Sequence, residues 1–202
     1  MLVGATLADL PTGTTVATGS ARRRVQLANL RPDLTFADLR GNLATRLARV
    51  GADGVTAVVA ARAALDRLGW VPPAGLVVET LEPGTMLPQV AQGALAVECR
   101  EEDADTRAAL AAIDDRSVRA VVEAERAFLA ELGGGCTLPV GAYAVHDGGG
   151  LRLTGLLAGA DGHVVLRHEA VGPDGPALGR GVARYLLDDA GGSDLGARSA
   201  RA

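Results

Sequence analysis

Three strand-and-helix units follow one another in the first third of the chain, and this succession limits the fold more than any other feature. Short β-branched or apolar runs are each followed by a helical pattern: 14–18 then 21–30, 34–39 then 42–50, and 55–60 then 61–68. A helix between two strands usually returns the chain to a parallel neighbour, so repeated units favour a doubly wound α/β sheet. We therefore predict a parallel-sheet α/β domain at the start of the chain.

Arginines gather at the turns that join these strands to their helices. Seven arginines and two acids lie between residues 22 and 49, giving this segment +5 in a chain of net charge −4. Ser20 is a suitable helix N-cap, which places Arg22 and Arg23 in the first turn, where a cation is unfavourable unless an anion binds. A solvated basic face or a nucleic-acid patch is the alternative. Because the carboxyl ends of parallel strands meet at one edge, we predict an anion-binding cradle there.

The composition argues against several classes of function. Five aromatic residues among 202 leave a core of Leu, Val and Ala and no base-stacking platform. No apolar run reaches the roughly 18 residues of a membrane span, and the start lacks the charged flank of a signal peptide. The two cysteines fit neither a disulfide framework nor a zinc site. We therefore expect a cytoplasmic protein with no metal, no membrane contact and no nucleic-acid partner.

Cys136 stands on a glycine turn directly after a helical pattern that we expect Ser117 to cap. Three glycines precede it and Pro139 follows shortly after. Glycines permit left-handed backbone and leave the sulfur unshielded, which suits a thiol that another molecule must reach. A helix C-cap followed by a small buried cysteine is the structural alternative.

The remaining segments predict a second, smaller domain. Proline and glycine between residues 72 and 88 mark an irregular crossing, after which 94–99 is predicted as a strand and 105–113 as a short helix. Alternating segments at 151–156 and 164–167, separated by Asp-Gly turns, predict antiparallel strands. With a covering helix at 178–187, they predict a small α+β domain with an antiparallel sheet.

Four motifs occur in one order and spacing: VATGSARRRVQLANLRPDL at 16–34, LRGNLATRL at 39–47, QGALAVECR at 92–100 and GGGCTLPVGAYA at 133–144. Together they resemble hydroxymethylbilane synthase (porphobilinogen deaminase) over nearly the whole chain. The resemblance implies a transferase of tetrapyrrole (porphyrin and heme) biosynthesis. It condenses four units of the small-molecule substrate porphobilinogen head to tail, releases ammonia, and yields hydroxymethylbilane.

The resemblance also implies a dipyrromethane cofactor held through a thioether by Cys136. Carried over by motif, the other residues expected to bind cofactor or substrate carboxylates, or to line the cleft, are Thr18, Ser20, Arg22, Arg23, Arg40, Gly41, Asn42, Arg46, Gln92 and Gly93. Bidentate guanidinium groups suit the acetate and propionate of each pyrrole. We expect Cys99 to be packed in its strand, and Arg24, Arg31 and Arg49 to be solvated.

The resemblance also leads us to expect that most of the family's first domain is missing from this sequence. The resemblance implies a periplasmic-binding-protein-like second domain at 1–88, a crossover at 89–115 that would complete the first domain, and a C-terminal α+β domain at 116–202. The family's catalytic aspartate lies in the missing part, so no catalytic residue is assigned. We expect an exposed apolar edge at the crossover and no activity from this chain alone.

Two other functions stay open at this point: a non-catalytic remnant that binds a pyrrole or another polycarboxylate, and one half of a split enzyme whose first domain is a separate chain. Full-length members are expected to be monomeric. Three residues depart from the family pattern: Ala17 and Ala91 replace glycine, and Arg62 replaces a small residue.

Overall fold

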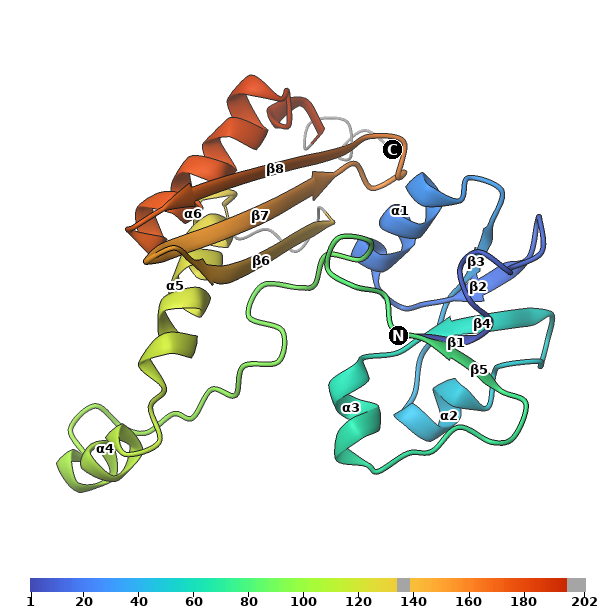
Figure 1. Cartoon of the computed structure of the whole chain (residues 1–202), viewed down its shortest axis with the longest axis horizontal. Helices are drawn as coiled ribbons and strands as arrows, with labels where there is room; N and C mark the ends of the chain where they lie inside the picture. Colours follow the sequence, from blue (N-terminus) through green and yellow to red (C-terminus); the bar gives the residue numbers. More distant parts are fainter. Residues whose placement is uncertain (134–138, 196–202) are drawn as a thin grey trace.

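The computed structural model describes residues 1–133 and 139–195 and contains two units joined by an irregular connecting segment (Figure 1). The N-terminal unit comprises residues 1–81, the connecting segment 82–115, and the C-terminal unit the described residues from 116 onward. Within the described residues, no helix is both long and apolar enough to cross a bilayer.

The N-terminal unit is built on a five-stranded mixed sheet with the order β3-β2-β4-β1-β5. The strands are β1 (Leu2–Gly4), β2 (Thr15–Ala17), β3 (Thr35–Ala37), β4 (Val55–Val59) and β5 (Val77–Glu79). The predicted strands β2, β3 and β4 are parallel, whereas β1 pairs antiparallel with both β4 and β5. A wholly parallel sheet was therefore wrong, because β1 enters the sheet between two later strands.

Helices cover both faces of this sheet. The helices are α1 (Ala21–Leu30), α2 (Leu43–Leu47) and α3 (Arg62–Arg67). On one face Leu27 of α1 packs with Leu2 and Val16, and on the other Leu65 of α3 packs with Val3 and Val58. The consecutive residues Leu2 and Val3 of β1 thus belong to opposite cores, because successive side chains of a strand point to opposite faces. This arrangement fixes the start of α1 beside the carboxyl ends of the parallel strands.

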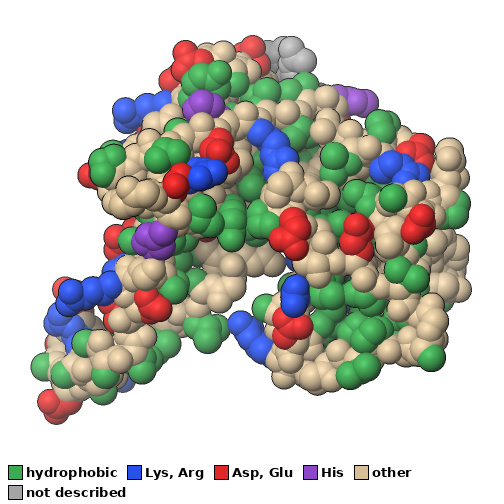
Figure 2. Space-filling model, in the orientation of Figure 1, with side chains coloured by type: hydrophobic (Ala, Val, Ile, Leu, Met, Phe, Trp, Pro, Cys, Tyr) green, Lys and Arg blue, Asp and Glu red, His purple; other side chains and the backbone are tan. Residues whose placement is uncertain are grey.

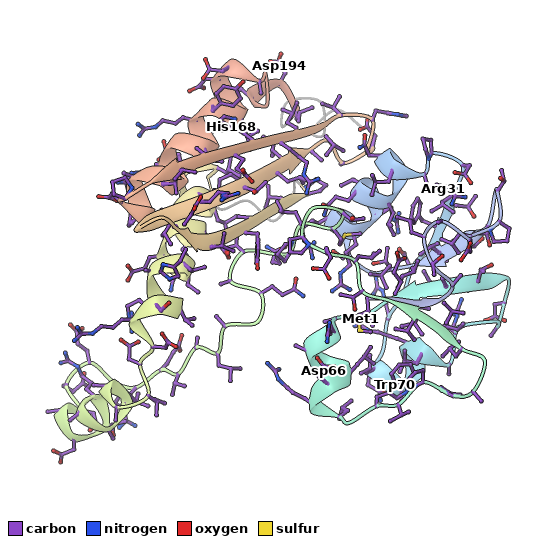
Figure 3. All side chains as sticks on the ribbon, viewed as in Figure 1. Met1, Arg31, Asp66, Trp70, His168 and Asp194 are labelled. Atoms are coloured by element: carbon purple, nitrogen blue, oxygen red, sulfur yellow. The ribbon has the colours of Figure 1, made fainter. Side chains whose placement is uncertain are left out.

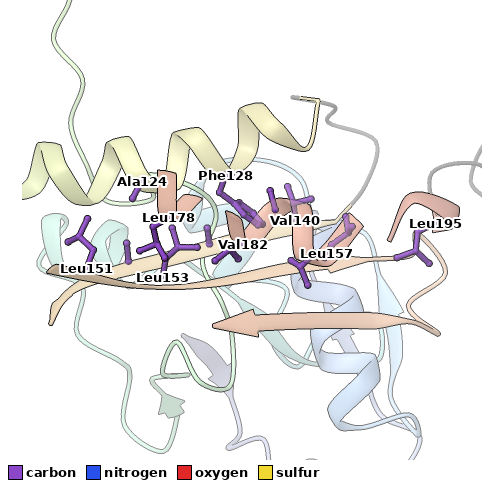
Figure 4. Close-up of a cluster of buried hydrophobic side chains, with 13 residues drawn as sticks. Ala124, Phe128, Val140, Leu151, Leu153, Leu157, Leu178, Val182 and Leu195 are labelled. Carbon is purple, nitrogen blue, oxygen red and sulfur yellow. The ribbon is translucent and has the colours of Figure 1, made fainter. Parts of the chain in front are cut away.

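The C-terminal unit packs two helices on one face of an antiparallel sheet with the order β6-β7-β8. Its elements are α5 (Arg116–Glu131), β6 (Val140–Asp147), β7 (Gly150–Ala158), β8 (Val165–Gly172), α6 (Gly175–Arg184) and a π-helical turn at Tyr185–Asp189. Phe128, Leu153 and Val182 are fully or almost fully buried between helices and sheet (Figure 4). The predicted antiparallel sheet is confirmed.

The helix before the glycine turn begins differently from our expectation. Asp115 is its N-cap, and the Asp115 carboxylate accepts hydrogen bonds from the backbone N–H groups of Ser117 and Val118. Ser117 lies inside the first turn, so the predicted cap was wrong by two residues. An aspartate and a serine are equally suitable caps in sequence, and the earlier one takes the role here.

The connecting segment contains one helix, α4 (Ala104–Ala111), and no strand at 94–99. Leu95 and Val97 are 80 % and 60 % exposed, and Cys99 is exposed. The strand and the packed cysteine were both wrong, because no described strand lies beside this run to pair with it. The expected exposure of apolar side chains is observed.

Candidate anion-binding site

Arginines from two strand-to-helix turns line one hollow of about 630 Å³ at the carboxyl ends of β2 and β3, which we call the arginine hollow. Predicted site residues in its lining are Ser20, Arg22, Arg23, Arg40, Gly41, Arg46 and Gln92. Gly19, Asp38, Leu39 and Gln89 complete it. Figure 2 shows a notch in the molecule between the arm that carries α4 and the N-terminal unit, with basic side chains on its wall.

The turn from β2 into α1 is held by its own hydroxyl groups. The Ser20 hydroxyl accepts a hydrogen bond from the Arg23 backbone N–H at 3.4 Å, which confirms the predicted N-cap. The buried Thr18 hydroxyl accepts one from the Ser20 N–H at 3.3 Å. Thr18 therefore stabilises the turn through this hydrogen bond and is not part of the lining of the hollow.

Arg22 is almost completely buried, with 6 % of its surface exposed. Its Nη1 donates to the carbonyl oxygen of Leu87, and its Nη2 donates to Oε1 of Gln92 at 3.4 Å. Its Nε has no hydrogen-bond partner among residues 1–133 and 139–195. Burial, with a smaller effect of neighbouring Arg23, lowers the pKa of Arg22 to about 10. The guanidinium is thus still charged at neutral pH, and its hydrogen-bond partners are neutral.

The neighbouring arginines also bond to backbone carbonyl groups. Arg23 Nη1 donates to the Val59 oxygen at 3.0 Å, and Arg46 Nε donates to the Gly41 oxygen at 2.8 Å. Burial, and to a lesser extent the charge of Arg46, lowers the pKa of Arg23. Carbonyl dipoles orient these cations without neutralising them. An anion with several oxygen atoms would supply the missing charge.

One acid of the described chain lines the arginine hollow, and it is already engaged. The Asp38 carboxylate accepts a hydrogen bond from Arg24 Nη2 at 2.7 Å. Arg31 lies elsewhere, against the loop between β1 and β2, where it donates to the carbonyl groups of Leu7 and Leu10 (Figure 3). The hollow therefore carries a net positive charge that suits carboxylates.

Besides Thr18, two further predicted site residues, Asn42 and Gly93, do not line the hollow, and a third, Cys136, lies outside the described residues. Asn42 caps α2, its Oδ1 accepting from the N–H and hydroxyl of Thr45, both at 3.0 Å. Gly93 is exposed with φ +100° and is not part of the lining. Gly141, which follows Cys136 by five positions, packs against Arg22: a Cβ at 141 would lie 3.2 Å from Arg22 Cδ.

Sequence reasoning missed Glu125, a buried acid that holds the turn carrying Gln92. Its carboxylate accepts the backbone N–H groups of Ala91 at 2.6 Å and Ala144 at 2.9 Å. Burial raises the pKa of Glu125, and these two hydrogen bonds oppose that rise without cancelling it. The sequence did offer one signal: Glu125 is a single acid on the same apolar helical face as Val121 and Phe128, which indicates a buried carboxylate. Glu125 joins the connecting segment to both α5 and β6.

The residues that depart from the family pattern have distinct surroundings. Ala91 has φ +56°, a left-handed conformation that favours glycine. Ala17 is fully buried within β2. Arg62 is exposed and pairs with Asp66 at 3.4 Å, and it is not among the residues that line the hollow.

Comparison with known proteins relates this arrangement to one family. The family model described as porphobilinogen deaminase, dipyromethane cofactor binding domain, matches residues 1–108, and the model described as porphobilinogen deaminase, C-terminal domain, matches residues 120–188. The chain is 50 % identical to the porphobilinogen deaminase of Nocardia farcinica over 206 residues, covering 96 % of this chain and 57 % of that protein.

Two further relatives agree. The chain is 46 % identical to the porphobilinogen deaminase of Roseiflexus castenholzii, with 95 % of this chain and 62 % of that protein covered. It is 44 % identical to that of Streptococcus sanguinis, with 92 % and 60 % covered. The chain therefore spans about 60 % of the length of the curated relatives that it matches.

Proposed function

Since the chain belongs to the porphobilinogen deaminase family, we propose that its arginine hollow binds pyrrole carboxylates for hydroxymethylbilane synthase. That enzyme condenses four porphobilinogen molecules head to tail, with loss of ammonia, into hydroxymethylbilane for tetrapyrrole biosynthesis. The observation that carries the proposal is buried Arg22, whose charge faces neutral hydrogen-bond partners and whose Nε is unpaired among the described residues. The relatives are longer than this chain, which spans about 60 % of their length. We therefore propose the complete reaction only for this chain combined with the remaining part that those relatives contain.

The residues of the arginine hollow fit a dipyrromethane cofactor. Each of its pyrroles carries an acetate and a propionate, and the hollow offers arginine side chains on two turns and the N-terminal end of α1. We propose that Cys136 holds this group through a thioether, with Ser20, Arg22, Arg23, Arg40, Gly41, Arg46 and Gln92 around it. When bound, the group supplies the pyrrole carbon to which further units are added.

The side chains of this chain bind and orient carboxylates. Arginine forks donate paired hydrogen bonds to carboxylate oxygens, and partial burial strengthens the attraction by excluding water. Held at the mouth of two turns, they keep a pyrrole at one place and neutralise its negative charge. Among the described residues the hollow's acid, Asp38, is engaged by Arg24, so no proton-transfer role is assigned to this chain.

We also propose the domain limits 1–88, 89–115 and 116–202, with a periplasmic-binding-protein-like arrangement of the first. The exposed run at 94–99 supports a separately supplied partner, because its apolar side chains meet no strand in the described chain. A split enzyme is therefore the second candidate. Co-purification of the chain with a separate first-domain polypeptide, and recovery of turnover in the mixture, would distinguish it from a non-catalytic remnant.

The test of the cofactor proposal is the intact mass of the purified chain, combined with an aldehyde colour reaction for pyrroles. We expect an added mass equal to two linked pyrroles in the wild-type chain and in Cys99→Ser, and an unmodified mass in Cys136→Ser. An adduct that persists in Cys136→Ser would overturn the assignment of the attachment site. An unmodified wild-type chain after incubation with porphobilinogen would overturn cofactor loading by this chain.

A further inference from the structure

Gln26 is a buried polar residue of α1 that the proposed function does not use. It lies one helical turn after Arg22, with 4 % of its surface exposed. Residues four apart lie on the same helix face, so both side chains meet the connecting segment where it runs beside α1 (Figure 1). A buried amide must have hydrogen-bond partners to offset its lost hydration.

The Gln26 amide satisfies both backbone groups of one residue, Leu87. Its Oε1 accepts the Leu87 N–H at 2.7 Å, and its Nε2 donates to the Leu87 carbonyl oxygen at 3.1 Å. The same Nε2 donates to the Arg22 carbonyl oxygen at 3.1 Å. One orientation of the amide meets all three partners, so the Leu87 backbone is fixed relative to α1.

The Leu87 carbonyl oxygen is also the acceptor for Arg22 Nη1. Arg22 and Gln26 therefore share one oxygen, whose position Gln26 sets from the other side. The Arg22 guanidinium is held through Nη1 by Leu87 and through Nη2 by Gln92, and its Nε stays without a partner among the described residues. If Leu87 were free to turn, Arg22 would lose the contact that orients it.

We propose that Gln26 is a positioning residue for carboxylate binding: it fixes the Leu87 peptide, which in turn holds the Arg22 guanidinium at the wall of the arginine hollow. This inference rests on the proposed function of the arginine hollow. Gln26 touches no ligand in this scheme and acts through Arg22. It makes binding at the hollow depend on the docking of the connecting segment.

The test compares Gln26→Met and Gln26→Glu with wild type and with Asn29→Met, an exposed position of α1. Methionine keeps the length and removes all three hydrogen bonds, whereas glutamate keeps the acceptor for the Leu87 N–H and removes both donors. Three quantities are measured on the whole chain: the Kd for porphobilinogen, the melting temperature, and the ¹H–¹⁵N resonance of Arg22 Nε, assigned with Arg22→Lys.

We expect a protected Arg22 Nε–H resonance in wild type and Asn29→Met that broadens or vanishes in both Gln26 variants. We expect Kd to rise roughly tenfold in both, the size of a lost hydrogen bond to a charged group. A lower melting temperature with unchanged Kd and an unchanged resonance would overturn the positioning role. If wild type binds no porphobilinogen, the proposed function fails, and the resonance alone then decides whether Gln26 orients Arg22.

Discussion

Two arginines of the hollow, one buried and one half-buried, differ from two exposed arginines of the C-terminal unit in what they bond. Arg22 and Arg23 donate to neutral oxygens, and burial lowers the pKa of both. Arg119 and Arg152 each meet a carboxylate at 2.5 Å, and those hydrogen bonds raise the pKa of both. An arginine bonded to neutral groups keeps a charge for a ligand, whereas one paired with an acid does not.

Arg167 shows that this difference follows the hydrogen-bond partner of an arginine and not the unit in which the arginine lies. It belongs to β8 of the C-terminal unit but donates to the carbonyl groups of Gly84 at 2.7 Å and Pro83 at 3.1 Å, and burial lowers its pKa. These bonds join the C-terminal unit to the connecting segment. The exposed ion pairs of the C-terminal unit should accordingly add little stability, and tight packing should supply most of it.

The largest effect should follow from filling the contact between α5 and α6. A Cβ at Gly179 would collide with the Ala124 carbonyl oxygen and lie 2.8 Å from the Phe128 nitrogen. We expect Gly179→Ala to lower the free energy of unfolding by about 2–3 kcal/mol in urea titrations, because the helices must separate.

Gly181→Ala is the matched control, since nothing lies within 4 Å of that Cβ. It should be neutral or stabilise α6 by up to about 1 kcal/mol. If Arg184→Ala, which breaks the pair with Glu131, destabilises the chain more than Gly179→Ala, packing does not dominate this unit.

The next effect concerns ligand binding. Arg22→Ala should weaken porphobilinogen binding by roughly 10- to 100-fold, because it removes a charged donor from a partly water-free site. Arg152→Ala should change it by less than about twofold and should alter stability little, because its ion pairs are exposed to solvent. Isothermal titration with both variants measures the contrast. Equal losses would break the distinction between the two sets of arginines.

Ala91 offers a gain in stability at the turn that carries Gln92. Ala91→Gly should raise the free energy of unfolding by about 1 kcal/mol, since an L-residue at φ +56° is strained and glycine is not. Ala94→Gly, three residues later and without the left-handed conformation, is the control and should not stabilise the chain. A stabilisation of equal size at both positions would contradict the strain argument.

The smallest effect is a pH dependence at Glu125, an acid bonded to neutral N–H groups. Burial raises its pKa above the ordinary value of 4.5, so its contribution to stability is fully present below that pH and is lost as pH rises through the raised pKa. The wild type should thus gain stability relative to Glu125→Gln as pH falls from 7 to 4. Asp114, whose pKa hydrogen bonding to Arg119 lowers, should show the opposite sign in Asp114→Asn.

Local signals made much of the fold predictable. The Ser20 cap fixed the start of α1, and alternating strands with Asp-Gly turns predicted the antiparallel sheet. β1 and β5 escaped prediction because each has three residues and pairs at long range, Leu2 with both Val59 and Glu79. The 94–99 run has a strand-like pattern, but a strand needs a neighbour, and sequence pattern alone does not show one.

Most residues of the candidate site could be predicted from the sequence, but the contacts that hold them in place could not. All four arginines predicted from the motif positions line the arginine hollow. The burial of Arg22 depends on Leu87, 65 positions away, and on Gln26, whose partner is 61 positions away. Such contacts depend on how the connecting segment packs on α1, which periodicity does not encode.

The exposed run from 92 to 102 contributes little to holding the two units together. The contacts that hold the C-terminal unit lie earlier in the connecting segment: the Ala142 N–H donates to the Pro88 carbonyl oxygen at 3.2 Å, and Glu125 accepts from Ala91. Leu87 of the same segment is bonded to Arg22 and Gln26 of the N-terminal unit. A protease that cuts within the run would therefore leave two fragments that migrate separately on a denaturing gel yet elute together under native conditions. An unbroken polypeptide at this place is therefore not required for the assembled fold. Two shorter chains would form the same interface.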